Sequence, residues 1–187
     1  MARKKKTVDL DRDNGVAPGI IAKTKKRLVV AGGRSHPELT AAVAEALGTE
    51  IAPVEHRTFA SGEIYARFEV SIRGVDLFLV QTFGEPVNEW LMETLIMIDA
   101  AKRASAKRIT VVAPYYPYSR QDKKGRGREP ISARLVADLL KTAGADRVMS
   151  VDLHAAQIQG FFDGPVDHLF AKPVLLEHFE RTLSPED

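Results

Sequence analysis

Short apolar runs alternate with longer segments of helical periodicity along most of the chain, and this alternation constrains the fold more than any other feature. The apolar runs lie at residues 27–31, 77–80, 109–113 and 148–151. Runs this short, without a polar face, are typical of strands that are covered on both sides. Because helical segments separate them, the pattern predicts βαβ units. The expected fold is therefore α/β, a mainly parallel sheet flanked by helices.

Local signals set the expected bounds of the helices. Ser35 lies where the first helix should be capped, and Asn88 lies at the same place before the second. Pro130 is expected to open a third helix that Gly144 ends. The helices are expected at residues 37–47, 89–103, 130–140 and 173–182, and two further strands at residues 51–55 and 64–70, with a turn at residues 61–62 between them.

Composition limits the class of protein. A chain of 187 residues with 44% hydrophobic residues has enough apolar material for about one domain. No apolar run approaches the roughly 18 residues that a membrane span requires, so no membrane association is expected. The absence of cysteine excludes disulfides, thiolate zinc sites and thiol catalysis, and it fits a cytoplasmic protein.

The first 26 residues differ from the rest of the chain. They mix Lys, Asp, Gly and Pro without a helical or strand period. Such a composition predicts a flexible extension over residues 1–26, followed by one domain over residues 27–187. Its basic start is not followed by an apolar stretch, which argues against a secretory signal.

A long basic loop is expected over residues 114–129, directly after a buried strand. Open parallel sheets bind ligands beyond the carboxyl ends of their strands, and the Arg and Lys side chains suit a polyphosphate. The usual nucleotide fingerprints are missing: there is no G-x-x-x-x-G-K-[ST] and no complete G-x-G-x-x-G. From the residues alone, a solvated loop or a subunit contact remains an alternative.

Two shorter segments are candidates for chemistry. Asp152 and His154 follow the strand at residues 148–151 and could together hold a metal or move a proton, although Asp152 could equally cap a helix. Residues 59–63 form a turn that could bind an adenine or be an ordinary hairpin. The other histidines have no metal-ligand spacing and are interpreted as surface or packing residues: His36, His56, His168 and His178.

Several unusual strings occur in a characteristic order. They lie at residues 59–63, 88–93, 114–122, 151–155 and 157–163, and they include Arg-Gln-Asp and Asp-Leu-His. In these strings the chain resembles the ribose-phosphate pyrophosphokinase family, also called phosphoribosyl pyrophosphate synthetases, from about residue 28 to residue 179. The resemblance implies a phosphoribosyltransferase-like fold, as the first of the family's two similar domains.

The resemblance also implies an activity. The family transfers the β,γ-pyrophosphoryl group of Mg-ATP to the 1-hydroxyl of ribose 5-phosphate, which gives 5-phosphoribosyl 1-pyrophosphate and AMP. By resemblance, ATP would bind at Phe59, Ser61, Gly62, Glu63, Arg120 and Gln121, and Mg²⁺ at His154. A regulatory phosphate or ADP site at a subunit contact would draw on Ser71, Arg73, Arg126 and Asp167. The family's members are ring-like homohexamers, so a homo-oligomer is expected.

The sequence departs from the family in two respects. Ser61 stands where the family usually carries Asp or Asn. The family's ribose-phosphate loop and its catalytic Lys and Arg are expected beyond Asp187, and no Asp-Asp pair occurs in the chain. The chain is therefore expected to carry mainly the ATP half-site and to make little product alone.

Three other functions are compatible with parts of the sequence. The first is a catalytically inactive, truncated or regulatory nucleotide-binding subunit of the same family. The second is a nucleic-acid binder that uses the basic tail and loop, for which binding would depend steeply on salt and not on ATP. The third is a phosphoribosyltransferase, which is disfavoured because its substrate loop is absent. The expected partners are thus ATP and ribose 5-phosphate, without nucleic acid.

Overall fold

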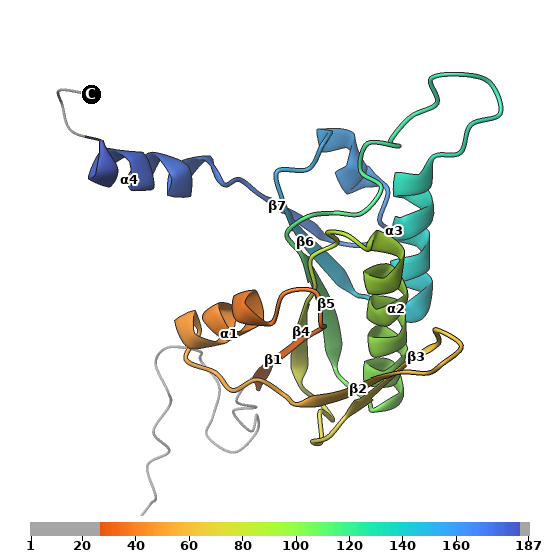
Figure 1. Cartoon of the computed structure of the whole chain (residues 1–187), viewed down its shortest axis with the longest axis vertical. Coiled ribbons are helices and arrows are strands. Elements are labelled where there is room, and N and C mark those ends of the chain that lie inside the picture. The colour runs from red at the N-terminus through yellow and green to blue at the C-terminus, as the bar shows by residue number, and fades with distance from the viewer. Residues whose placement is uncertain (1–26, 184–187) are drawn as a thin grey trace, which may run out of the picture.

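A five-stranded parallel sheet forms the centre of the molecule (Figure 1). The computed structural model describes residues 27–183, so the extension expected over residues 1–26 lies outside the described residues. The strands are β1 (Leu28–Gly32), β4 (Asp76–Val80), β5 (Arg108–Ala113), β6 (Arg147–Val151) and β7 (Val166–Leu169), in the order β1-β4-β5-β6-β7. Every neighbouring pair is parallel, which confirms the predicted α/β fold.

Helices cover both faces of the sheet, but unequally. Helices α2 (Val87–Arg103) and α3 (Ser132–Ala143) cover one face, and α1 (Pro37–Ala46) lies on the other beside β1 (Figure 1). The main core lies under α2 and α3 and includes Leu77, Ile98, Val111 and Leu140, each fully buried. Helix α4 (Lys172–Thr182) projects from this body and has no buried residue. None of the helices within residues 27–183 has the length and apolarity needed to cross a lipid bilayer.

A two-stranded antiparallel hairpin crosses α2 near its C-terminal half (Figure 1). Its strands are β2 (Val54–Thr58) and β3 (Ile64–Phe68). The strand expected at residues 51–55 was therefore placed too early. Ile51 forms only an isolated bridge with Val30, and Pro53, which has no N–H to donate, separates that bridge from the hairpin.

The expected helix starts need correction. His36, not Ser35, caps α1: its Nδ1 accepts the Leu39 N–H at 3.2 Å, because the Ser35 hydroxyl is engaged elsewhere. Asn88 lies inside α2, and its side-chain oxygen accepts a hydrogen bond from the Tyr118 hydroxyl. Helix α3 begins at Ser132 and not at Pro130.

Strand β7 was not predicted. It has only four residues, and Asp167 and His168 interrupt its apolar pattern. It is the edge strand of the sheet, next to β6, and a short 3₁₀ turn, η1 (Ala156–Gly160), precedes it in the chain. Short, polar edge strands carry little periodic signal, because only one neighbour strand contacts them.

Candidate functional site

Two of the segments expected to bear chemistry meet at the carboxyl edge of the sheet. The basic loop leaves β5 at residue 114, and the loop that carries Asp152 and His154 leaves the adjacent β6. The Val151 N–H donates to Pro114 O at 3.2 Å, so the two loops begin side by side. This edge is where open parallel sheets bind ligands.

Buried groups anchor the first half of the basic loop. Tyr116 is buried, and its hydroxyl donates to Ala133 O of α3 at 3.1 Å. Burial, together with the charge of Asp138, raises the pKa of Tyr116 well above its usual value, so the phenol stays protonated and donating. Asp122 is also buried, and Oδ2 of its carboxylate accepts from Gln157 Nε2 of η1 at 2.6 Å. The loop is thus joined to both α3 and η1.

The predicted Arg-Gln pair lies between these anchors. Gln121 is held by α3: its Oε1 accepts from the Ser132 hydroxyl at 2.6 Å, and its backbone O accepts from Ala133 N at 3.2 Å. Arg120 is exposed. A fixed backbone with an exposed guanidinium next to it is suited to bind an anionic group, because little ordering remains to be done on binding.

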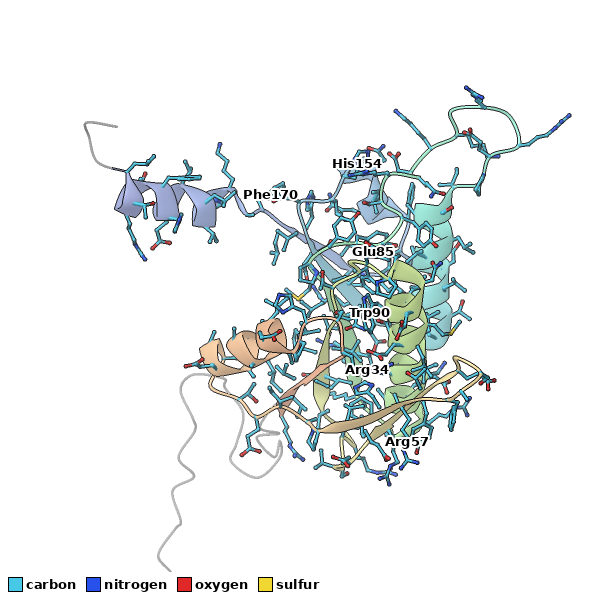
Figure 2. All side chains as sticks on the ribbon, in the orientation of Figure 1. Arg34, Arg57, Glu85, Trp90, His154 and Phe170 are labelled. Carbon is cyan, nitrogen blue, oxygen red and sulfur yellow. The ribbon has the colours of Figure 1, made fainter. Side chains whose placement is uncertain are left out.

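His154 lies in the loop after β6, and its side chain is exposed (Figure 2). Within residues 27–183, no three Asp, Glu, His or Cys side chains gather as a metal site would require. An isolated imidazole is a poor site for Mg²⁺, which prefers oxygen ligands. His154 thus suits a role as one ligand of a metal ion that already carries other ligands, and the residues within 27–183 do not fit a resident metal centre.

The turn at residues 59–63 lies elsewhere in the molecule. Figure 2 shows Arg57, at the end of β2, near the bottom of the view and His154 near the top, with Trp90 of α2 between them. In the turn itself, Gly62 N donates to Phe59 O at 2.8 Å, and the Ser61 hydroxyl donates to Glu63 Oε2 at 2.7 Å. Phe59 is half exposed, at 51%. Within a single chain, this turn therefore lies away from Arg120 and His154.

A buried polar network ties the hairpin to the sheet, and the sequence reasoning missed it. The carboxylate of Glu93 is fully buried and accepts from Arg34 N at 2.7 Å, Arg34 Nε at 2.6 Å and Gln81 Nε2 at 3.0 Å. The Ser35 hydroxyl donates to Gln81 Oε1 at 2.7 Å. Arg34 Nη1 then donates to Thr58 Oγ1 at 3.1 Å, directly before the turn. The sequence signal that could have revealed this network is Glu93, a charged residue on the inward face of α2.

His56 of β2 borders this network. Its Nδ1 lies 3.7 Å from Glu93 Oε2, and its side chain is 12% exposed. Burial lowers the pKa of His56, an effect that the Glu93 charge opposes only in part. The expectation of a packing residue thus fits His56.

Comparison with known proteins decides the family. The profile of the N-terminal domain of ribose phosphate pyrophosphokinase matches residues 28–144, more than half of the chain. The chain belongs to the ribose-phosphate pyrophosphokinase family. The resemblance noted in the sequence is thereby confirmed.

Individual relatives agree with this assignment. The ribose-phosphate pyrophosphokinase of Corynebacterium efficiens is 63% identical over 155 residues, which cover 83% of this chain and 48% of the relative. That of Mycobacterium tuberculosis is 62% identical over 151 residues, which cover 81% and 46%. The crystal structure of phosphoribosylpyrophosphate synthetase from Mycobacterium smegmatis superposes with a TM-score of 0.81 at 60% identity, covering 84% of this chain and 53% of that one. The chain spans about half the length of these relatives.

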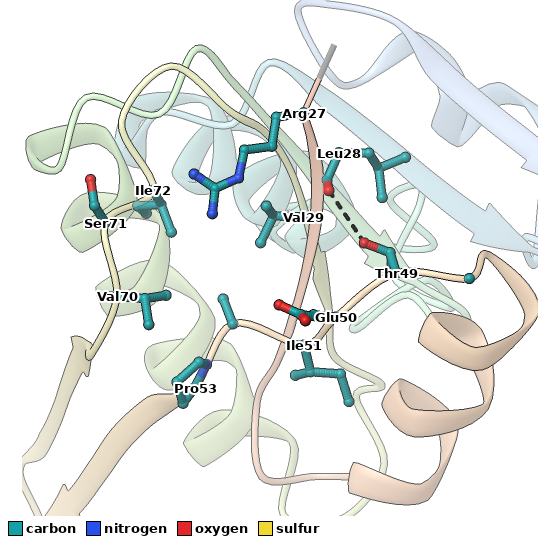
Figure 3. A pocket seen from close by; sticks show the side chains of 12 residues that line it. Arg27, Leu28, Val29, Thr49, Glu50, Ile51, Pro53, Val70, Ser71 and Ile72 are labelled. Atoms are coloured by element: carbon teal, nitrogen blue, oxygen red, sulfur yellow. Dashed lines mark hydrogen bonds between the residues drawn. The ribbon is translucent and has the colours of Figure 1, made fainter. Parts of the chain in front are cut away.

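The residues that the family resemblance assigned to a regulatory site are also dispersed. Ser71 and Arg73 lie in the connection between β3 and β4, at the bottom of Figure 1, whereas Arg126 lies in the basic loop at the top. Both carboxylate oxygens of Asp167 on β7 accept from Arg147 Nη1, at 2.9 and 2.7 Å. Ser71 borders a cavity of about 370 Å³ beside the start of β1, with Arg27 and Glu50 on its walls (Figure 3). A regulatory role for these residues stays a prediction.

Proposed function

We propose that this chain binds Mg-ATP and carries the ATP half of pyrophosphoryl transfer to ribose 5-phosphate, the reaction that gives 5-phosphoribosyl 1-pyrophosphate and AMP. The observation that supports it most is the exposed Arg120 on a loop whose neighbours Gln121 and Asp122 are held by α3 and η1. Pyrophosphoryl transfer requires mainly positioning and neutralisation of charge. A guanidinium on an anchored loop supplies both.

Mg²⁺ enters this proposal as part of the substrate. Protein-bound Mg²⁺ usually keeps several waters and shares its remaining positions with substrate phosphates. His154 would add one ligand to the ion that ATP carries, which agrees with the lack of a metal cluster within residues 27–183. We further propose a cytoplasmic location, on the ground that the chain contains no cysteine.

Two copies of the chain would form one complete ATP site. The turn at residues 59–63 and the edge with Arg120 and His154 lie apart within one chain (Figure 2). If both contact one nucleotide, the turn of one subunit must reach the basic loop of another. A symmetric dimer would repeat this contact twice, so we propose a homo-oligomer with shared sites.

Calorimetric titration of the whole chain with Mg-ATP tests the proposal. Removal of a charged contact to phosphate amounts to about 1.5–3 kcal/mol, so Arg120→Ala should weaken binding roughly 10- to 150-fold. Lys107→Ala is the matched control, because it removes one exposed positive charge at the start of β5, the opposite edge of the sheet.

The two variants separate site binding from general electrostatic attraction. The proposal fails if the folded wild-type chain takes up no Mg-ATP. It fails equally if Lys107→Ala weakens binding as much as Arg120→Ala, since the loop would then have no special role.

A further inference from the structure

The end of β7 holds the loop that carries His154. Three hydrogen bonds connect the two segments: Asp152 N donates to Leu169 O at 2.9 Å, Ala171 N donates to Asp152 Oδ2 at 3.2 Å, and Leu153 N donates to His168 Nε2 at 3.0 Å. We refer to residues 168–171 as the β7 clamp. His168 is the member of the clamp whose side chain makes the contact.

The loop needs such support because its backbone is unusual. Asp152 has φ of +46°, in the left-handed region that non-glycine residues seldom occupy. Conformations of this kind persist only where the surroundings hold them. Two clamp contacts fix Asp152 itself, and the third fixes the next peptide, which leads directly to His154.

The chemistry of His168 suits the contact. A ring nitrogen that accepts a backbone N–H must carry no proton, so the hydrogen bond from Leu153 N requires an unprotonated Nε2 on His168. The ring also packs on Phe170, with 4.4 Å between centroids and 39° between planes. This ring contact limits rotation of the imidazole and keeps Nε2 directed at Leu153.

We propose that His168 is a positioning residue for the nucleotide site: it holds the Leu153 amide and thereby sets where the His154 imidazole points. This role rests on the proposed function, in which His154 contacts the metal of Mg-ATP. Groups that orient a metal ligand through a hydrogen bond commonly change affinity 10- to 100-fold when they are removed. This role of His168 could not be predicted from the sequence, because its partner is a backbone N–H in the loop after another strand.

Two substitutions of His168 test the proposal in the whole chain. His168→Phe keeps an aromatic ring against Phe170 but removes the acceptor. His168→Gln places an amide oxygen near the position of Nε2. We expect His168→Phe to weaken Mg-ATP binding about 10-fold and His168→Gln to stay within about threefold of the wild type. His178→Phe, on the exposed α4, is the matched control and should bind like the wild type.

Rescue by glutamine distinguishes positioning from simple packing, since only the acceptor is common to Gln and His. Equal affinity of His168→Phe and the wild type would overturn the proposal. So would a His168→Gln chain as weak as His168→Phe.

Hydrogen exchange of the Leu153 amide provides a readout that does not depend on nucleotide binding. This amide should be protected in the wild type and in His168→Gln, and should exchange about 10-fold faster or more in His168→Phe. If the folded wild-type chain does not bind Mg-ATP, the proposed function fails, while the exchange rates still decide the clamp. Unchanged exchange at Leu153 in His168→Phe would show that His168 does not hold this loop.

Discussion

Replacing Glu93 by Ala should destabilise the domain far more than the same change at its neighbour Glu89. The carboxylate is fully buried and accepts three hydrogen bonds, two from Arg34 and one from Gln81. Its removal leaves a guanidinium, a backbone N–H and an amide without their acceptor. Breaking a buried ion pair in this way typically lowers the free energy of unfolding by about 3–5 kcal/mol.

The lower end of that range applies here, because the side chain of Arg34 is 32% exposed and can partly regain water. We therefore expect a loss of about 3 kcal/mol, which corresponds to a fall in Tm of about 6–12 °C for a domain of this size. Glu89→Ala is the matched control. Its carboxylate lies 3.8 Å from Arg34 Nη2 and is 40% exposed, so the change should stay within about 0.5 kcal/mol.

Urea unfolding measures both variants. Trp90 is the single tryptophan of the chain and lies one helical turn from Glu93, so its fluorescence reports on the region directly, and circular dichroism reports on the whole fold. An unchanged m value would show that the variants unfold from the same compact state. A loss below about 1 kcal/mol in Glu93→Ala, or an equal loss in Glu89→Ala, would refute the reasoning.

Three further outcomes follow from the structure. Because burial lowers the pKa of His56, the unfolded chain binds more protons than the folded chain below about pH 6.5. The free energy of unfolding should therefore fall as the pH drops from about 7.5 to 5.5, and it should fall less in His56→Gln, as urea unfolding at several pH values can check. Tyr116→Phe removes the hydroxyl that donates to Ala133 O and should lower stability by about 1 kcal/mol in the same assay, whereas no loss would mean that this bond does not anchor the loop. Phe59→Ala and Arg120→Ala chains should each bind Mg-ATP weakly, yet an equal mixture should regain about a quarter of the wild-type sites, since half of randomly formed dimers hold one intact site out of two. The stoichiometry of calorimetric titration measures this, and a mixture that binds no better than its components would argue against shared sites.

The parallel sheet could be predicted because its signal is local and repeated. Val29, Leu77 and Val111 lie in apolar runs that are buried on both faces, and such runs stand out in the sequence. Strand β7 escaped because Asp167 faces Arg147 and His168 faces Leu153, so its polar residues have partners that no linear pattern reveals.

Cap residues were harder to assign than elements. Ser35 is the better cap by propensity, but its hydroxyl donates to Gln81 and accepts from Thr82 N at 3.1 Å, and His36 takes its place. The choice between them depends on a side chain that lies 46 residues further along the chain. Tertiary contacts of this kind override local preference.

The candidate site was predictable as a set of motifs but not as an arrangement. Arg120 and His154 follow adjacent strands, and topology alone placed them at one edge. Nothing in the order of the motifs shows that the turn at residues 59–63 lies beyond α2. That separation depends on where the hairpin packs, and the hairpin is held there by the network around Glu93.

The order of the strands has a consequence for the growing chain during synthesis. Strands β4, β5 and β6 each pair with the next strand of the sheet to emerge from the ribosome, but β1 waits until α1 and the whole hairpin have been made. Until β4 arrives, β1 presents an apolar edge without its native neighbour, the situation in which nascent chains pair wrongly or recruit chaperones. The first strand of the sheet to be translated thus waits longest for its partner.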